Sequence, residues 1–336
     1  MTRRAGHATS AVKITDVAFA AGVAPMTVSR VLNTPERVSE PTALRVREAI
    51  ERLGYVPNLI AGGLSSRRSR MISAILPTIA SPMFSVPMQS FTDTLSRAGY
   101  NVMLGLSGYE EGGEDPLIRA VLTRRPDGLL LTGTNHSPAA RRLLADAGVP
   151  VVEIWDATET PTDMLVGFDH HELGAIVADF FAAAGHTRFA VLAAKDPRAA
   201  ARRDGFVSRV RQHGGTLLAA HTLTAPGSIM DGRLALREIA PQLGERTAIF
   251  CSSDNLAFGV VTEARVLGIA VPERLAVCGF GDFEMSRSGE PPITTVSVDG
   301  AGMGRLAAEN LLARIGGGTA PRRVLVPPRI IERAST

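Results

Sequence analysis

The chain has 336 residues, 45% of them hydrophobic and 21% charged, which is enough for two or three folded units with sizeable cores. It contains no apolar run near the roughly 18 residues that cross a bilayer, and its start lacks the hydrophobic core of a signal peptide, so we expect a soluble, cytoplasmic protein. The net charge of +3 is unevenly divided. Residues 1–70 hold eleven Lys and Arg against five Asp and Glu, a net charge of +6, which leaves −3 for the rest of the chain. A positive charge at one end suits the binding of a polyanion there.

The N-terminal residues carry apolar side chains at helical spacing. Residues 14–21 predict a short helix that ends at Gly22, where a tight turn needs a positive φ. A second helix is expected over residues 25–33 and a third over residues 41–53. This order predicts an all-α helix-turn-helix DNA-binding headpiece over residues 1–57. The expected core of the headpiece is Val17, Ala18, Ala21, Val23, Val28, Leu32, Val46, Ile50 and Leu53.

The second helix would lie in the DNA major groove with its early residues at the base edges. We expect Pro25, Met26 and Arg30 to point outward. A guanidinium can bridge guanine O6 and N7, whereas Met26 offers only an apolar contact, for instance to a thymine methyl. Short donors suited to phosphate oxygens, which fix register rather than sequence, are Thr27, Ser29 and Asn33. The other interpretation of these helices is an ordinary three-helix cap on an enzyme.

Two motifs make the headpiece more specific. Residues 16–33 read DVAFAAGVAPMTVSRVLN, and residues 53–58 read LGYVPN. Together they resemble the headpiece of the LacI/GalR (lactose-repressor) family. The resemblance implies that residues 58–70 form a hinge helix and linker, that Asn58 belongs to the DNA-contacting segment, and that Leu64 wedges into the minor groove at the operator centre.

The sequence departs from the family pattern at two places. Lys13 stands where the family usually has a Thr that caps the first helix, so a cap worth about 1 kcal/mol is missing. Gly62 and Gly63 lie in the hinge, where each Gly costs about 1 kcal/mol relative to Ala. We therefore expect the hinge to fold only on the operator.

From residue 71 onward, short apolar runs alternate with helix-like stretches. This βα alternation predicts parallel, doubly wound sheets. The alternation of strands and helices starts again after a Pro/Thr/Asp-rich connector at residues 157–163. The two series predict an α/β body of two Rossmann-like lobes over residues 71–336. Strands are expected at residues 71–76, 101–104, 128–132, 151–154, 165–168, 189–193, 217–220, 248–251, 275–279, 294–298, 324–327 and 329–332.

The family resemblance extends to this body, which is similar to periplasmic sugar-binding proteins. It implies that the chain crosses between the lobes three times. The expected crossings lie near residues 156–164, 296–299 and 327–328. The expected lobes are residues 71–160 with 298–327, and residues 161–297 with 328–336.

Ligands of open α/β sheets bind outside the carboxyl ends of the strands, so the loops between the lobes are the expected effector site. By family position, Arg202 grips ligand oxygens, and a guanidinium suits a carboxylate or a hydroxyl pair. Ser253 and Asp254 match the family's Asn-Asp pair. Residues 280–282 match the family's G-Y/F-D-D motif, but Gly281 stands in place of the first acid. The loss of that carboxylate while Arg202 is kept favours an anionic effector. The candidate effector-binding residues are Phe84, His136, Trp155, Phe168, Asp169, Arg202, Ser253, Asp254 and Asp282.

Three stretches, at residues 131–138, 151–156 and 166–169, resemble the gluconate-operon repressor branch of the family. The leading interpretation is a homodimeric transcriptional repressor that reads a near-palindromic operator and is released from it by a sugar acid such as gluconate. The alternative is a regulator of the same type that responds to a neutral sugar or acts with a corepressor. More distant alternatives are a stand-alone sugar-binding protein for uptake and a sugar-acid enzyme on a Rossmann pair.

The sequence carries no complete catalytic, cofactor or metal motif. Residues 279–284 begin like a dinucleotide-binding loop but lack its third small residue, and the histidines in residues 169–172 lack metal-ligand spacing. Cys251 and Cys278 lie inside apolar runs and are expected to be buried strand residues. We therefore expect no cofactor, no metal and no enzymatic activity.

Overall fold

The structure is a computed structural model that describes residues 12–56, 68–110 and 112–336. The chain divides into two compact units, Met1–Ser69 and Arg70–Thr336, and each is described here by itself. The headpiece belongs to the first unit and the two-lobed body to the second. The predicted hinge helix, with Asn58 and Leu64, lies outside the described residues.

The headpiece consists of three short helices, α1 (Ile14–Ala21), α2 (Pro25–Asn33) and α3 (Glu40–Leu53), with a 3-10 turn, η1 (Pro35–Arg37), before α3. Gly22 ends α1 in the left-handed region at φ +66°, as the sequence predicts. The Lys13 side chain caps nothing at the start of α1. Instead the backbone N–H of Lys13 donates to the Asp16 carboxylate at 2.8 Å, so one of the open backbone donors is still satisfied.

A small apolar core joins the three helices, and one predicted member of it is wrong. Leu32 is 37% exposed, whereas Val31 is 6% exposed and packs inside. Both residues flank the helix face of Val28, at i+3 and i+4, so helical spacing alone does not separate them. The buried residues are Val17, Ala18, Ala21, Val28, Val31, Ala43, Val46 and Ala49, and half-buried residues packed against them include Val23, Ile50 and Leu53.

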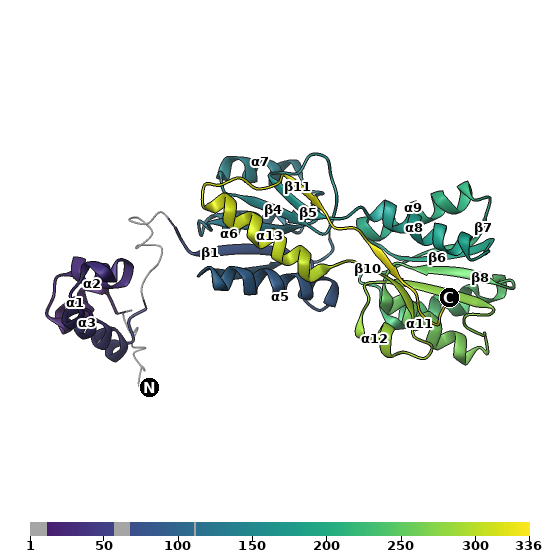
Figure 1. Ribbon diagram of the computed structural model, residues 1–336, viewed down its shortest axis with the longest axis horizontal. Coiled ribbons are helices and arrows are strands. Elements are labelled where there is room, and N and C mark those ends of the chain that lie inside the picture. Colours follow the sequence, from purple (N-terminus) through teal and green to yellow (C-terminus); the bar gives the residue numbers. More distant parts are fainter. Residues whose placement is uncertain (1–11, 57–67, 111) are drawn as a thin grey trace, which may run out of the picture. The chain divides into compact units, whose positions relative to one another are not determined.

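The first lobe of the body is a fully parallel six-stranded sheet with helices on both faces (Figure 1). Its strand order is β11-β5-β4-β3-β1-β2. The strands are β1 (Met71–Leu76), β2 (Asn101–Leu106), β3 (Gly128–Thr132), β4 (Val151–Ile154), β5 (Met164–Gly167) and β11 (Arg323–Leu325). One face packs on α5 (Pro82–Arg97) and α13 (Gly300–Ile315), and the other on α6 (Asp115–Leu122) and α7 (Pro138–Ala147).

The second lobe repeats this plan with the strand order β12-β10-β9-β8-β6-β7, in which only β12 runs antiparallel to its neighbour. The strands are β6 (Arg188–Ala194), β7 (Thr216–Leu223), β8 (Thr247–Cys251), β9 (Leu275–Phe280), β10 (Thr294–Ser297) and β12 (Arg329–Ile331). One face packs on α8 (His170–Ala183) and α9 (Pro197–Gln212), the other on α10 (Ile229–Ile239) and α11 (Asp254–Val266). A 3-10 turn, η2 (Ala240–Gln242), follows α10, and a short helix, α12 (Glu284–Ser288), follows β9. Cys251 and Cys278 are buried on neighbouring strands, as expected.

The first crossing between the lobes lies later in the chain than the sequence predicts. The expected boundary near residue 161 assigns β5 to the second lobe, but β5 pairs with β4 and β11 in the first sheet. The chain therefore crosses after Gly167, between β5 and α8. The other crossings fall between β10 and α13 and between β11 and β12.

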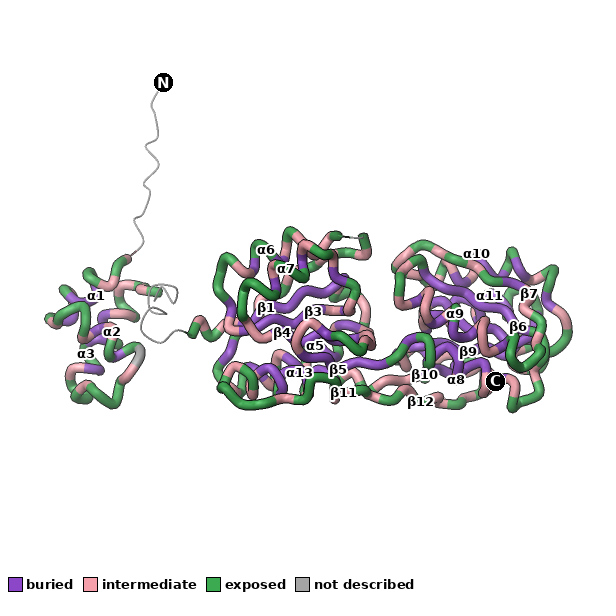
Figure 2. Tube along the Cα trace, turned by 90° about the horizontal axis from the view of Figure 1, so that it is seen from above, coloured by how far each residue is buried: buried purple, intermediate pink, exposed green. Residues whose placement is uncertain are grey.

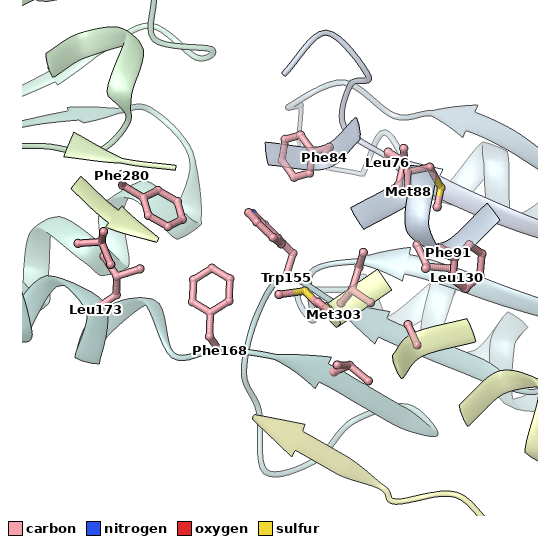
Figure 3. Packing of buried hydrophobic residues seen from close by; sticks show 14 of the residues in the cluster. Leu76, Phe84, Met88, Phe91, Leu130, Trp155, Phe168, Leu173, Phe280 and Met303 are labelled. Atoms are coloured by element: carbon pink, nitrogen blue, oxygen red, sulfur yellow. The ribbon is translucent and has the colours of Figure 1, made fainter. Parts of the chain in front are cut away.

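The central strands form the buried layer of each lobe, between helices whose outer faces are exposed, while the edge strands β2, β7, β11 and β12 are largely exposed or half-buried (Figure 2). An aromatic group joins the two lobes where the chain crosses. Trp155, at the end of β4, extends toward Phe168 and Phe280 of the neighbouring segments, with ring centroids 5.2 and 6.5 Å away (Figure 3). The core of one lobe thus continues into that of the other at this point.

Candidate functional site

The outward face of α2 carries the side chains that the sequence assigns to base contacts. Pro25, Met26 and Arg30 are exposed, and the Met26 side chain is 64% exposed although it is apolar. Thr27 and Ser29 are half-buried at the edges of this face. Asn33 is the last residue of α2, and its side chain is outside what the structure describes. The opposite face, with Val28 and Val31, holds α2 in the headpiece core, so the exposed face is presented on a rigid support.

A cavity of about 70 Å³ lies between the two lobes, and we call it the interlobe cavity. Its walls come from the carboxyl ends of strands in both sheets, where ligands of open α/β sheets bind. From the candidates named above it brings together Phe84, Trp155, Arg202 and Ser253. The complete lining is Ser81, Met83, Phe84, Tyr109, Trp155, Ala194, Asp196, Arg198, Arg202, Pro226, Gly227, Ser252, Ser253, Asn255 and Phe283.

Two glycines bring Arg202 to this cavity. A Cβ atom on Gly174 would overlap the backbone of Arg202, and one on Gly205 would overlap the backbone of His171. The helices α8 and α9 therefore approach closely only because both positions are glycine. This contact places the middle of α9 beside the first turn of α8.

The Arg202 guanidinium is held in place by two of its three nitrogens. Its Nη1 donates to His170 Nδ1 at 2.8 Å, its Nη2 donates to the carbonyl oxygen of Ser252 at 3.1 Å, and its carbon lies 4.5 Å from the centre of the Phe280 ring. Arg202 is only 4% exposed, and burial lowers its pKa to about 10, so the group stays protonated at neutral pH. Its buried Nε has no hydrogen-bond partner among the described residues. A buried donor left unpaired costs about 1–3 kcal/mol, which a ligand acceptor would offset.

A second guanidinium, that of Arg198, lines the same cavity one helical turn before Arg202. Arg198 comes from the second lobe, yet its guanidinium carbon lies 5.5 Å from the centre of the Phe84 ring in the first lobe. Its nearest acid is Asp196, with 3.9 Å between Arg198 Nε and Asp196 Oδ1. The same Asp196 oxygen accepts two backbone N–H groups at the start of α9, so it is already engaged.

Five predicted effector residues lie elsewhere than in the interlobe cavity, and Phe168 and Asp169 are two of them. Phe168 is fully buried against the Trp155 ring and is not among the residues that line the interlobe cavity. Asp169 is exposed and caps α8 by accepting the N–H groups of His171 and Glu172. Neither residue is placed to contact a ligand in this cavity.

His136 is a third predicted residue that lies outside the interlobe cavity. Its ring nitrogens lie 2.6 Å from a Glu114 oxygen and 2.9 Å from a Glu153 oxygen, so both are already engaged. Burial alone would lower the pKa of His136, but the hydrogen bonds to these two carboxylates raise it to about 9. The residue stabilises the loop between β3 and α7 and is not among the cavity-lining residues.

Asp254 is likewise not among the residues that line the interlobe cavity. It is fully buried and accepts hydrogen bonds from the Thr295 hydroxyl at 2.6 Å and from the Phe283 N–H at 2.8 Å. These bonds attach the start of α11 to β10 and to the segment after β9, so both carboxylate oxygens have partners within the lobe. Ser253 does reach the cavity while its hydroxyl caps α11.

Asp282 and Gly281 line a different cavity of about 730 Å³, which we call the second cavity. The Asp282 carboxylate pairs with Arg287 and Arg333, and these hydrogen bonds hold its pKa below the ordinary range despite burial, which alone would raise it. Gly281 has φ +128°, and a Cβ atom there would lie 2.6 Å from the Phe283 ring. Glycine is thus required by the backbone at this position, and the loss of an acid there is weaker evidence for an anionic ligand than the sequence suggests.

Sequence reasoning missed several lining residues, of which Arg198, Asp196, Tyr109 and Asn255 are the most polar. Asp196 caps α9 and Arg198 lies in its first turn, and the i, i+4 spacing of Arg198 to Arg202 was a usable signal. Tyr109 and Asn255 gave no signal of their own. Among the described residues no cluster of three or more His, Cys, Asp or Glu could hold a metal ion. None of the helices in the described ranges has the length and apolar content to cross a membrane.

A helix-turn-helix headpiece on a two-lobed body with a cavity between the lobes is the architecture of a ligand-responsive DNA-binding regulator. Comparison with known proteins agrees with this class. Residues 13–58 match the bacterial regulatory proteins of the lacI family, and residues 178–336 match the periplasmic binding protein-like domain.

Characterised relatives match over nearly the whole chain. The HTH-type transcriptional regulator GntR of Escherichia coli K12 is 32% identical over 92% of this chain and 94% of its own length. The regulator of the same name in Pseudomonas aeruginosa is 34% identical over 94% of this chain and 92% of its own length. The crystal structure of a LacI-family transcriptional regulator from Silicibacter pomeroyi is 30% identical, covers 96% of this chain and 99% of its own, and superposes with a TM-score of 0.89. The chain belongs to the LacI family, and it is a DNA-binding transcriptional regulator rather than an enzyme.

Proposed function

We propose that this regulator represses sugar-acid utilisation genes and that its effector, a sugar acid of the gluconate type, binds in the interlobe cavity. The observation that carries the proposal is the pair of guanidinium groups at this cavity, Arg198 and Arg202, with the Nε of Arg202 unpaired among the described residues. Guanidinium groups bind carboxylates through charge-assisted hydrogen bonds, which are about twice as strong as neutral ones.

The charge balance of the lining favours one negative group on the ligand. The lining contains two Arg and one Asp, a formal charge of +1, so a monocarboxylate would bring the site to neutrality. Side chains with hydroxyl or amide groups, Ser81, Ser253 and Asn255, are suited to the hydroxyls of a sugar chain. Trp155 and Phe84 provide an apolar wall for its carbon backbone. The similarity to regulators named GntR supports the same class of effector.

The exposed face of α2 would read one half-site of the operator, so a homodimer on a near-palindromic operator is the expected active form. Binding of the sugar acid would release the operator. This part of the proposal rests on the headpiece geometry and on the family to which the chain belongs.

A thermal-shift titration of the purified chain tests the effector class. The panel is gluconate, 2-ketogluconate, 6-phosphogluconate, galactose and ribose. At a hundred times its dissociation constant a true effector stabilises the protein by about 2.7 kcal/mol, which raises Tm by a few degrees. We expect a sugar acid to produce this shift. A shift with only the neutral sugars would contradict the sugar-acid proposal and leave the regulator class intact.

The variant Arg198→Gln tests the site. It removes a charge that faces the cavity, and we expect the dissociation constant of the sugar acid, measured by calorimetry, to rise about tenfold or more. The matched control is Arg203→Gln on the same helix, because Arg203 pairs with Asp204 and the Thr222 hydroxyl away from the cavity. Equal affinities in the two variants would remove Arg198 from the binding site.

A further inference from the structure

A chain of hydrogen bonds leads from the interlobe cavity to the first crossing between the lobes. Arg202 Nη1 donates to His170 Nδ1 at 2.8 Å, and His170 Nε2 lies 3.0 Å from the carbonyl oxygen of Trp155. Arg202 belongs to α9, His170 is the first residue of α8, and Trp155 follows β4. The imidazole therefore connects the second lobe to the first at the crossing itself.

The hydrogen-bond partners of His170 determine its tautomer and its protonation state. A guanidinium only donates hydrogen bonds and a carbonyl oxygen only accepts them, so Nδ1 must be the acceptor and Nε2 must carry the proton. His170 is 2% exposed, and burial together with the Arg202 charge lowers its pKa well below the ordinary value of an imidazole. The ring is thus a neutral Nε2–H tautomer that accepts a hydrogen bond from Arg202 and donates one to the Trp155 carbonyl. We call these two hydrogen bonds the relay.

The carbonyl that His170 holds belongs to a residue with an unusual backbone. Trp155 has φ +69°, in the left-handed region that bulky residues rarely adopt. Such a conformation persists only where its surroundings fix it. Trp155 lines both cavities, and its ring packs on Phe168 and Phe280. Its backbone and its ring therefore both take part in the contact between the lobes.

We propose that His170 is a positioning residue that couples effector binding at Arg202 to the arrangement of the lobes through the Trp155 carbonyl. The inference rests on the proposed function, since the ligand is the anion drawn to the unpaired Nε of Arg202. An anion there changes the position of the guanidinium. The His170 ring moves with the guanidinium because its Nδ1 accepts a hydrogen bond from it. The Trp155 carbonyl in turn moves with His170, whose Nε2 donates to it.

The test measures coupling rather than binding alone. A DNA fragment is selected from a random pool with the wild-type protein, and its affinity is measured with and without saturating gluconate. The ratio is the coupling factor, which in allosteric proteins is typically about 5- to 150-fold. We expect His170→Phe, which keeps a ring but makes neither hydrogen bond, to lower this factor to near one while gluconate still binds by calorimetry.

Two further variants separate the relay from a general structural role. A Gln amide offers an acceptor and a donor about as far apart as the ring nitrogens, so His170→Gln should restore much of the coupling, whereas the shorter His170→Asn should not. These two decide the question if His170→Phe does not fold. His171→Phe, at the exposed neighbouring histidine, is the matched control and should keep wild-type coupling.

The outcomes distinguish the two proposals. Wild-type coupling in a His170→Phe protein that still binds gluconate would overturn the relay and leave the proposed function standing. Equal coupling in His170→Gln and His170→Asn would overturn it as well. If no sugar acid of the panel binds the wild-type protein, the proposed function fails, and the relay fails with it.

Discussion

At the scale of single residues, the charge on His136 is expected to contribute to the stability of the body. Its pKa is about 9 in the folded chain, against about 6.5 for an imidazole in an unfolded one. Because the folded value is the higher one, the contribution is fully present below about pH 6.5 and is lost as the pH rises through about 9. The shift corresponds to at most about 3 kcal/mol, since one pKa unit is 1.36 kcal/mol.

Urea unfolding at a series of pH values checks this expectation. The free energy of unfolding of the wild-type protein should fall between about pH 6.5 and pH 9, and His136→Gln should be less stable near pH 6.5 with a flatter dependence on pH. The control His171→Gln, at an exposed residue, should follow the wild-type curve. Parallel curves for His136→Gln and the wild-type protein would show that the imidazole is not charged between its two carboxylates.

Polar residues at strand ends show how far a sequence can specify a site. The order of strands places His136, Asp254 and Arg202 near the edge where ligands bind, and the sequence predicts this much. Whether each one faces a ligand depends on partners distant in the chain. The Glu153 partner of His136 is 17 residues away, and the Thr295 partner of Asp254 is 41 residues away. Of these three, Arg202 alone lines the interlobe cavity, and its Nε has no partner among the described residues. No local pattern reveals that difference.

At the scale of elements, apolar periodicity predicts most bounds well because each strand and helix must bury one face. The predicted strand at residues 128–132 matches β3, and the helix at residues 25–33 matches α2. The short helix α12 was missed, since Glu284–Ser288 is too short to show a helical repeat. Its position is fixed instead by Asp254, which accepts the N–H of Phe283 directly before the helix, and by Asp282, which accepts from Arg287 near its end.

The exposed face of α2 supports a prediction about the choice of operator. Met26 is 64% exposed on that helix and can make only apolar contacts with bases. Met26→Gln introduces an amide that can pair with adenine, so we expect a changed preference at one base position per half-site, worth about 1–3 kcal/mol. The salt dependence of binding should stay the same, because the number of phosphate contacts does not change.

Selection from a randomised DNA pool, followed by affinity measurements at several salt concentrations, checks this prediction. Leu44→Gln is the matched control, because Leu44 is an exposed apolar residue on α3. It should select the same sequences as the wild-type protein. If Met26→Gln also selected those sequences, Met26 would not be a base-contacting residue.

At the scale of the whole molecule, the body is two sheets joined by three crossings, and the assignment of β5 shows what the sequence leaves open. The polar connector before β5, residues 157–163, suggests a boundary between lobes. However, β5 returns to the first sheet because its pairing with β4 and β11 buries it on both sides. The crossing consequently runs directly into α8. This is why His170, at the first turn of α8, lies between the two lobes.

A regulator with an effector site and a DNA site must also obey reciprocity. If a sugar acid weakens operator affinity by a given factor, saturating operator must weaken the affinity for that acid by the same factor. Calorimetric titration of gluconate into the free protein and into the protein–operator complex measures the second factor, and gel-shift titration measures the first. We expect both to lie within about 5- to 150-fold and to agree. An unchanged gluconate affinity in the presence of saturating operator would show that gluconate, although bound, is not the effector, and the remaining acids of the panel would then be titrated in the same way.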